Sequence, residues 1–358
     1  MIPLALVGMS YREAPSAVRA GLVAMDSGAE GPASQLLEAG EITGVVRVES
    51  CARVEWLLAS ARPAWAAELF GAALIGAAEN PDRLRPRVRH GAAALGGLLR
   101  VAAGLDSVAQ GEHAIGNQVL RSFERAHEAG TMCRNLHVAW RGVGELLGRA
   151  RRILPQGRTG GVQTLVVQRM PDVPRDAPVA VFGLGEIGRA TLRALADAGF
   201  TAVESFNRAS MRAFEGAVQR AHTVIVASGA PQAWLNLPEG GGRRVFDLGS
   251  PLQIRDAPGW QLTPLDELLD GHGAVLPESE YAALDAECAA GVERICQALL
   301  APPPSDTLAA MTAMRTEFMQ NKLPGLLEGL PPQRARKVTS EVNAMLHQFI
   351  AAARRETP

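Results

Sequence analysis

Residues 49–56 bring three reactive side chains, Cys51, Arg53 and Glu55, within five positions of one another. A thiol is a nucleophile only as its thiolate, and a nearby guanidinium lowers the pKa of a thiol. An arginine fork also holds a carboxylate in a fixed orientation. This stretch can therefore both attack a substrate and clamp it. The alternative is a buried small hydrophobe beside a surface ion pair, because free cysteine is among the most buried residue types.

A second chemical motif begins at residue 179, where Val-Ala-Val-Phe predicts a strand that runs into Gly183-x-Gly185-x-x-Gly188. A helix is predicted after it, over residues 189–198. This strand–glycine–helix order indicates a dinucleotide-binding domain of the Rossmann type. The glycines let the backbone approach a pyrophosphate at a helix N-terminus. We expect the cofactor to contact the residues of this loop, namely Gly183, Gly185, Glu186, Ile187 and Gly188.

The next predicted strand, residues 202–206, ends in Asn207-Arg208. A site that prefers NAD carries an acid at this point, to bind the ribose 2′-hydroxyl. Glu204 lies too far back in the strand for that role. Asn207 and Arg208 suit a 2′-phosphate instead, so the predicted cofactor is NADPH. Two further strands, at 223–227 and 244–248, end in small-residue turns at the edge of a parallel sheet where ligands bind.

The bulk composition sets limits on the class of protein. A length of 358 residues allows two or three domains, and 47% hydrophobic with 20% charged residues is typical of soluble globular domains. The net charge of −1 gives no global nucleic-acid signal, so an RNA contact would be a local patch. The four arginines in residues 83–90 are one candidate, with a solvated loop or edge strand as the alternative.

No run of 18 apolar residues exists, and the N-terminus lacks the charged region of a signal peptide, so we expect no membrane association. The spacings of the four cysteines fit neither a disulfide framework nor a zinc site, so no metal is expected. A reducing cytoplasm is the expected location.

The remaining pattern places these motifs on three domains. Strands are expected at 2–8, 44–49 and 54–58, which puts Cys51 on the turn leaving a strand. A helix breaks at Gly104, another opens at Gln118, and polar residues between them are either turn chemistry or a pocket wall. The expected fold class is α/β multidomain. An N-terminal α+β catalytic domain covers 1–153, a Rossmann-type domain with its connector covers 154–268, and an all-helical dimerisation domain covers 269–358.

A nucleophilic cysteine, an arginine clamp and a dinucleotide domain together suggest that a thiolate attacks an activated acyl group and that the thioester is then reduced to an aldehyde. The motifs resemble those of the glutamyl-tRNA reductase family. Residues 8–19 resemble its N-terminal signature, residues 50–55 resemble its Thr-Cys-Asn-Arg-x-Glu, and residues 100–119 resemble its longest signature.

The resemblance implies the roles of several residues. Cys51 would be the nucleophile, and Arg53 would bind the carboxylate of the substrate. The substrate pocket would further include Ser50, Ser107, Glu112 and Gln118. The implied reaction is the NADPH-dependent reduction of glutamyl-tRNA(Glu) to glutamate-1-semialdehyde, which leads to 5-aminolevulinate and porphyrins. The implied partners are the charged tRNA and a second copy in a homodimer, with product channelling to glutamate-1-semialdehyde aminomutase as a further expectation.

The chain also departs from the family pattern. Gly97 stands where the family usually has a histidine that is thought to assist acid–base steps, His113 where it has proline, and Asn117 where it has glycine. Two alternatives follow. The chain is a paralogue that uses another aminoacyl donor or serves a non-catalytic tRNA-binding or regulatory role, or it is a different NADP-dependent oxidoreductase in which Cys51 is structural.

Overall fold

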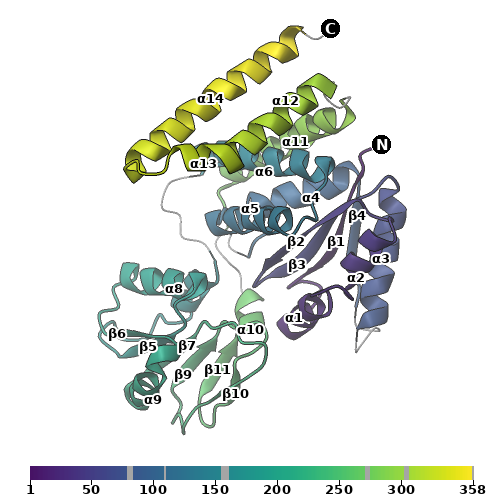
Figure 1. The fold of residues 1–358 in the computed structure, drawn as a ribbon. Coiled ribbons are helices and arrows are strands. Elements are labelled where there is room, and N and C mark those ends of the chain that lie inside the picture. Colours follow the sequence, from purple (N-terminus) through teal and green to yellow (C-terminus); the bar gives the residue numbers. More distant parts are fainter. Residues whose placement is uncertain (79–83, 109, 155–160, 271–274, 302–305, 357–358) are drawn as a thin grey trace. The chain divides into compact units, whose positions relative to one another are not determined.

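A computed structural model describes residues 1–78, 84–108, 110–154, 161–270, 275–301 and 306–356 (Figure 1). The chain forms two compact units, Met1–Leu300 and Ala301–Pro358. The first unit combines an antiparallel sheet with helices and a five-stranded parallel sheet, and the second is helical. The predicted α/β fold class, with a Rossmann-type sheet and a helical C-terminal region, is confirmed.

The N-terminal sheet is antiparallel, with the strand order β2-β3-β1-β4. Its strands are β1 (Leu4–Ser10), β2 (Gly44–Ser50), β3 (Arg53–Ala59) and β4 (Arg87–His90). The expectation that the first strand ends at Gly8 was wrong. Gly8 pairs with Glu55 inside the ladder, and a side chain on Gly8 would clash with the backbone of β3. The glycine therefore permits close pairing rather than making a turn.

Helices cover both faces of this sheet. One face packs against α1 (Ser16–Met25), α2 (Pro32–Glu38) and α3 (Pro63–Ala77). The other packs against α4 (Ala92–Ala102), α5 (His113–Glu128), α6 (Arg134–Ile153) and α11 (Glu278–Leu300). Alternate residues of β1 serve the two cores, Leu4 and Leu6 on one side and Ala5 and Val7 on the other. This double burial explains why β1 is an unbroken apolar run.

The parallel sheet has the strand order β11-β9-β7-β5-β6. Its strands are β5 (Val179–Phe182), β6 (Val203–Phe206), β7 (Thr223–Val226), β9 (Arg244–Asp247) and β11 (Gln261–Pro264). Around it lie α7 (Val162–Gln168), α8 (Glu186–Asp197), the 3-10 turn η2 (Arg208–Ser210), α9 (Met211–Arg220), α10 (Leu265–Leu269) and the short strands β8 (Leu235–Asn236) and β10 (Ile254–Asp256). The pattern failed to predict β11 because it is an edge strand whose first residues are exposed.

Two helices begin earlier than predicted. The helix expected to open at Gln118 begins at His113, and the one expected from Arg189 begins at Glu186. Gly111, with a φ of 78°, makes the turn before α5. Gly188 lies inside the first turn of α8, where a side chain would clash with the carbonyl of Gly183. A glycine inside a helix was thus mistaken for part of the preceding loop.

The second unit begins at Ala301, whereas the helical domain was expected to begin at residue 269. α11 packs on α4 and α6 through Cys288 and Ile295, so it belongs with the first unit. The second unit contains α12 (Asp306–Glu317), a π-helical turn η3 (Phe318–Lys322), α13 (Leu323–Leu326) and α14 (Pro332–Glu356), with α12 against α14. The proline tract at 302–305 lies outside the described residues. None of the described helices has an apolar stretch long enough to cross a membrane.

Candidate functional site

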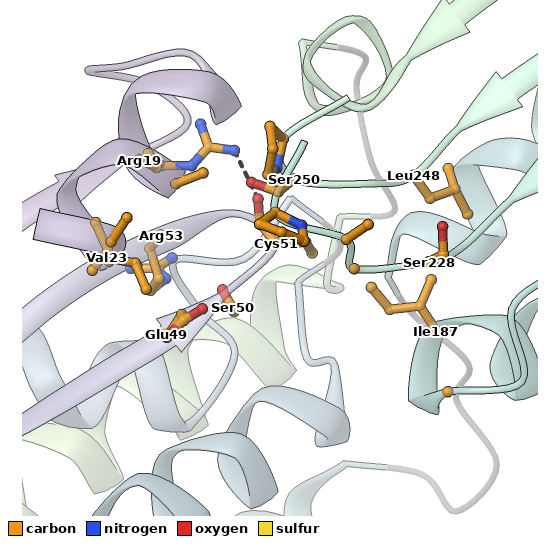
Figure 2. Close-up of a pocket in the computed structure, with 18 of the residues that line it drawn as sticks. Arg19, Val23, Glu49, Ser50, Cys51, Arg53, Ile187, Ser228, Leu248 and Ser250 are labelled. Carbon is orange, nitrogen blue, oxygen red and sulfur yellow. Dashed lines mark hydrogen bonds between the residues drawn. The ribbon is translucent and has the colours of Figure 1, made fainter. Parts of the chain in front are cut away.

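A cavity of about 730 Å³ lies between the N-terminal part of the first unit and its parallel sheet (Figure 2). One wall comes from α1, the Cys51 turn, β3 and α5. The opposite wall comes from residues 185–187 and from the turns that follow β7 and β9. The cavity therefore brings together the cysteine motif and the glycine motif, which are more than 130 positions apart in the sequence.

Cys51 occupies the tight turn between β2 and β3. Ser50 pairs with Arg53 across the hairpin, so only Cys51 and Ala52 lie outside the ladder. The Ser50 hydroxyl accepts a hydrogen bond from Ala52 N at 3.2 Å, and Ala52 O accepts one from Tyr11 N at 2.7 Å. These bonds fix the backbone on both sides of the thiol. The predicted position of Cys51, on the turn leaving a strand, is confirmed.

Arg53 lines the same cavity and is almost completely buried, with 3% of its surface exposed. Its Nη1 lies 3.4 Å from Glu55 Oε2, and its Nη2 donates to Asp106 O at 2.6 Å. Its Nε is buried and donates to no group among the described residues. A buried guanidinium with a spare donor is suited to receive an anionic group, because an unpaired buried donor is costly.

A second buried arginine, Arg19 of α1, also lines the cavity. Its Nη2 donates to Cys51 O at 2.7 Å and lies 3.4 Å from Asp266 Oδ1, while its Nη1 donates to Ala14 O. Figure 2 shows Arg19 and Cys51 joined in this way. Sequence reasoning noticed Arg19 only as part of a signature, because a residue 32 positions away gives no local signal of a contact with Cys51.

The resting thiol of Cys51 is protonated. Burial and, to a smaller extent, the charge of Glu112 raise its pKa to about 12, and the charges of Arg19 and Arg53 only partly oppose these effects. The charge of Arg53 lowers the pKa of Cys51, as expected from the sequence, but the effect of burial is larger. Cys51 is half-buried in the cavity wall, and its desolvation outweighs nearby cations that are shared with other partners.

The remaining predicted pocket residues are distributed unevenly. Ser50 and Gln118 line the cavity, whereas Ser107 and Glu112 are not among its lining residues. Ser107 is buried, and Glu112 precedes the first residue of α5. Burial raises the pKa of Glu112 to about 7, with a contribution from Glu186. Glu112 can therefore gain or lose a proton near neutral pH and acts on Cys51 through its charge.

The opposite wall combines glycines and small-residue turns with the larger side chains of Glu186, Ile187 and Leu248. A side chain on Gly183 or Gly188 would clash with backbone atoms, whereas a Cβ on Gly185 would meet nothing within 4 Å. Space therefore opens above Gly185, at the N-terminus of α8, where a pyrophosphate binds in dinucleotide sites. Glu186 turns toward α5, where Arg121 Nη2 lies 2.9 Å from both of its carboxylate oxygens.

Gln253 holds the two small-residue turns of this wall together and was missed by sequence reasoning. Its Oε1 accepts from Ser228 Oγ at 3.1 Å and from Ala230 N at 2.8 Å, and its Nε2 donates to Ala230 O and to Pro251 O. Gln253 is fully buried. The sequence gives no sign that a single glutamine hydrogen-bonds to loops that follow two different strands.

The residues expected to choose the cofactor lie outside the cavity lining. Asn207 directly follows β6, and its Oδ1 accepts from Ala209 N at 2.9 Å, so it caps η2. Arg208 is exposed. Glu204 lies within β6 and pairs with Arg220 at 3.3 Å, so it is engaged away from the strand end.

Comparisons with known proteins bear on the N-terminal half of the site. The family model described as "Glutamyl-tRNAGlu reductase, N-terminal domain" matches residues 7–150. Residues 7–150 are thus similar to the N-terminal domain of glutamyl-tRNA reductases. The match includes Cys51, Arg53 and Gln118, and it confirms the resemblance drawn from the motifs.

Whole relatives carry the same name. The glutamyl-tRNA reductase of Methanopyrus kandleri is 32% identical over 184 residues, which cover 50% of this chain and 43% of the relative. The one from Methanoculleus marisnigri is 31% identical over 59% of this chain and 48% of its own length. The one from Salinispora tropica is 26% identical over 96% and 86%. The chain thus spans about half the length of the first two relatives.

A solved structure titled "Glutamyl-tRNA Reductase from Methanopyrus kandleri" covers 99% of this chain and 98% of that chain, at 20% identity and a TM-score of 0.47.

At Gly97, where the resemblance leads one to expect a histidine, the structure shows what fills the space. A side chain on Gly97 would clash with the guanidinium of Arg89 and would lie 3.0 Å from Leu6 Cδ2. Arg89 of β4 therefore lies over the glycine. The described residues also contain no group of three His, Cys, Asp or Glu side chains that could hold a metal ion.

Proposed function

We propose that this chain is an NADPH-dependent reductase of glutamyl-tRNA(Glu) that forms glutamate-1-semialdehyde through a thioester on Cys51. One observation carries the proposal. A single cavity is lined both by the Cys51 turn of a region similar to the N-terminal domain of glutamyl-tRNA reductases and by the glycine loop of a dinucleotide fold. A thioester formed at Cys51 would therefore face the wall that suits a nicotinamide cofactor.

The first half-reaction uses residues of the N-terminal wall. The sulfur of Cys51 attacks the aminoacyl ester, so that a C–S bond forms and the ester C–O bond breaks. The thiol proton ends on the ribose hydroxyl of the released tRNA. Arg53 holds the side-chain carboxylate of the glutamyl group, through the donor that has no partner among the described residues. Because the pKa of the resting thiol is high, the proton has to leave before or during the attack.

The second half-reaction needs the opposite wall. Bound NADPH would supply the hydride that converts the thioester into an aldehyde and frees the sulfur. The open space above Gly185 and the N-terminus of α8 fit the pyrophosphate. Arg208, exposed after β6, fits the 2′-phosphate. The braced turns at 228–231 and 250–251 would lie along the cofactor and exclude water from the thioester.

We propose the second unit as the surface of a homodimer. Among its described residues, it exposes the large apolar side chains of Met314, Leu326, Leu330 and Met345. An apolar set of this kind on a helical unit fits a matching copy better than it fits water. Channelling of the product to an aminomutase stays a prediction.

One observation favours a second candidate. The guanidinium of Arg89 lies over Gly97, so no titratable group near neutral pH stands at the position of the family histidine. A paralogue that uses another aminoacyl donor, or that only binds tRNA, would tolerate this exchange. The different oxidoreductase in which Cys51 is structural has no comparable support.

The test is the consumption of NADPH with glutamyl-charged tRNA, measured for the wild type and for Cys51→Ala. The proposal predicts turnover in the wild type and none in Cys51→Ala. Cys133→Ala is the matched control, because Cys133 lies at the start of α6, outside the cavity lining. Turnover only with another charged tRNA would identify the paralogue, and equal turnover in Cys51→Ala would make the cysteine structural.

A further inference from the structure

Arg19 differs from the other charged groups near Cys51 because it joins the nucleophile to the second wall. Its Nη2 lies between two acceptors, Cys51 O at 2.7 Å and Asp266 Oδ1 at 3.4 Å. Asp266 belongs to the first turn of α10, which follows the last strand of the parallel sheet. The same carboxylate accepts two hydrogen bonds from Ser16 N and one from Ser16 Oγ, at 2.8–2.9 Å.

Because Arg19 is buried, its position is well defined and its charge acts strongly on neighbouring groups. Only 2% of its surface is exposed, and its Nε is buried without a partner among the described residues. Its Nη1 donates to Ala14 O, which anchors the guanidinium from the opposite side. A charge held in a buried place is weakly screened by solvent, so it acts strongly on its neighbours.

The charges of the two arginines beside Cys51 are neutralised to different degrees by their carboxylate partners. Arg53 faces the buried carboxylate of Glu55, whose side chain is 7% exposed. Arg19 faces Asp266, whose side chain is 35% exposed. A partly solvated carboxylate neutralises a nearby cation less than a buried one does. In agreement, Arg19 lowers the pKa of Cys51 more than Arg53 does.

We propose that Arg19 is a positioning residue that holds the Cys51 turn and stabilises the Cys51 thiolate. Asp266 of the dinucleotide-binding region partly neutralises the charge of Arg19, and it thereby sets how strongly that charge stabilises the thiolate. The reactivity of the nucleophile thereby depends on a contact with the region that would bind the cofactor. This inference rests on the proposed role of Cys51 as the nucleophile. It goes further in naming a residue pair that controls that nucleophile.

The charged groups that act on Cys51 come from four elements. They are Arg19 on α1, Arg53 on β3, Glu112 before α5 and, through Arg19, Asp266 on α10. Glu112 raises the pKa of Cys51 and the two arginines lower it. Since the thiol pKa lies near 12, the thiolate fraction between pH 8 and 9.5 is small, and it changes tenfold for each unit of the pKa.

The test is the rate at which iodoacetamide alkylates Cys51 in the full chain between pH 8 and 9.5, followed by mass spectrometry of the peptide that contains it. Arg19→Gln removes the charge, and we expect the rate to fall by about tenfold, which is one unit of pKa. Arg19→Lys retains the charge and should restore much of the rate. Asp266→Asn removes the counter-charge and should make the rate rise. Cys133, alkylated in the same sample, is the internal reference.

The opposite signs of these two effects separate the proposal from a purely structural role. If both variants alkylate faster, the turn has merely opened, and the proposal is overturned. It is also overturned if neither rate changes, or if Arg19→Lys is as slow as Arg19→Gln. The assay needs neither tRNA nor NADPH, so absence of reductase turnover in the wild type would refute the proposed function without touching this result.

Discussion

The two walls of the cavity achieve their effects by opposite means. The N-terminal wall carries buried charges, Arg19 and Arg53, each held by a carboxylate and by backbone carbonyls. The dinucleotide wall consists largely of the glycine loop and small-residue turns, which Gln253 holds together. The N-terminal wall acts through its charged side chains. The dinucleotide wall acts through backbone that its small residues leave accessible.

Because the two walls differ in this way, substitutions on each wall should affect different properties of the protein. On the charged wall, exchanging a side chain changes electrostatics at the reacting atoms and should alter chemistry first. On the glycine wall, adding a side chain either collides with backbone and alters folding, or fills open space and alters binding. The predictions below test this division.

The largest effect is expected on the charged wall. Arg53→Lys keeps the charge but loses the fork, so we expect kcat/KM with glutamyl-tRNA to fall by about a hundredfold. Arg47→Lys is the matched control, because Arg47 lies on β2 outside the cavity lining. Wild-type turnover in Arg53→Lys would remove the clamp role.

Next comes a pair of glycines on the other wall. Gly188→Ala should lower the free energy of unfolding by roughly 2 kcal/mol, since a Cβ there clashes with the carbonyl of Gly183. Gly185→Ala should change it by less than about 0.5 kcal/mol, because the space is open and the φ of −69° suits any residue. Urea denaturation measures both. Equal losses would show that the two glycines do not differ in this way.

The cofactor prediction is smaller. Arg208→Ala should weaken NADPH binding by about tenfold, the cost of losing one charge-assisted contact, and leave NADH binding nearly unchanged. Only NADPH carries the 2′-phosphate. Titration of intrinsic fluorescence with each nucleotide measures the two affinities. A parallel loss for both nucleotides would mean that Arg208 does not read that phosphate.

The smallest effect concerns Glu112, whose pKa is raised from 4.5 to about 7. The unfolded chain ionises this carboxyl first, so stability falls as the pH rises from about 4.5 to 7. Glu112→Gln removes this cost and should be more stable than the wild type at pH 8 by on the order of 1 kcal/mol, but not at pH 4.5. Thermal unfolding at both pH values checks this. A difference independent of pH would contradict the buried carboxyl.

The sequence allowed the two walls to be predicted separately. The hairpin around Cys51 follows from β-branched alternation, and the glycine loop follows from its strand and helix context. Their meeting in one cavity was expected only from the reaction that they suggested together. The cysteine motif and the glycine motif are more than 130 positions apart, so no periodic pattern in the sequence links them. Tertiary packing brings them together.

The parts that sequence reasoning missed share a physical cause. Arg19, Asp266 and Gln253 act through contacts between residues distant in the chain. The net rise of the Cys51 pKa could not be predicted, because the arginine is visible in the sequence and the burial is not. β11 was missed because an exposed edge strand has no apolar alternation. Desolvation and long-range pairing are properties of the folded chain.

The central claim is that both half-reactions pass through one thioester on Cys51, formed at the charged wall and reduced at the glycine wall. The most direct measurement is the release of labelled glutamate from charged tRNA without NADPH, for the wild type, Gly185→Phe and Cys51→Ala. Water is then the only outlet for the thioester, so the wild type and Gly185→Phe should release glutamate slowly and at similar rates, and Cys51→Ala should not exceed spontaneous hydrolysis. Release by Cys51→Ala as fast as by Gly185→Phe would contradict the thioester.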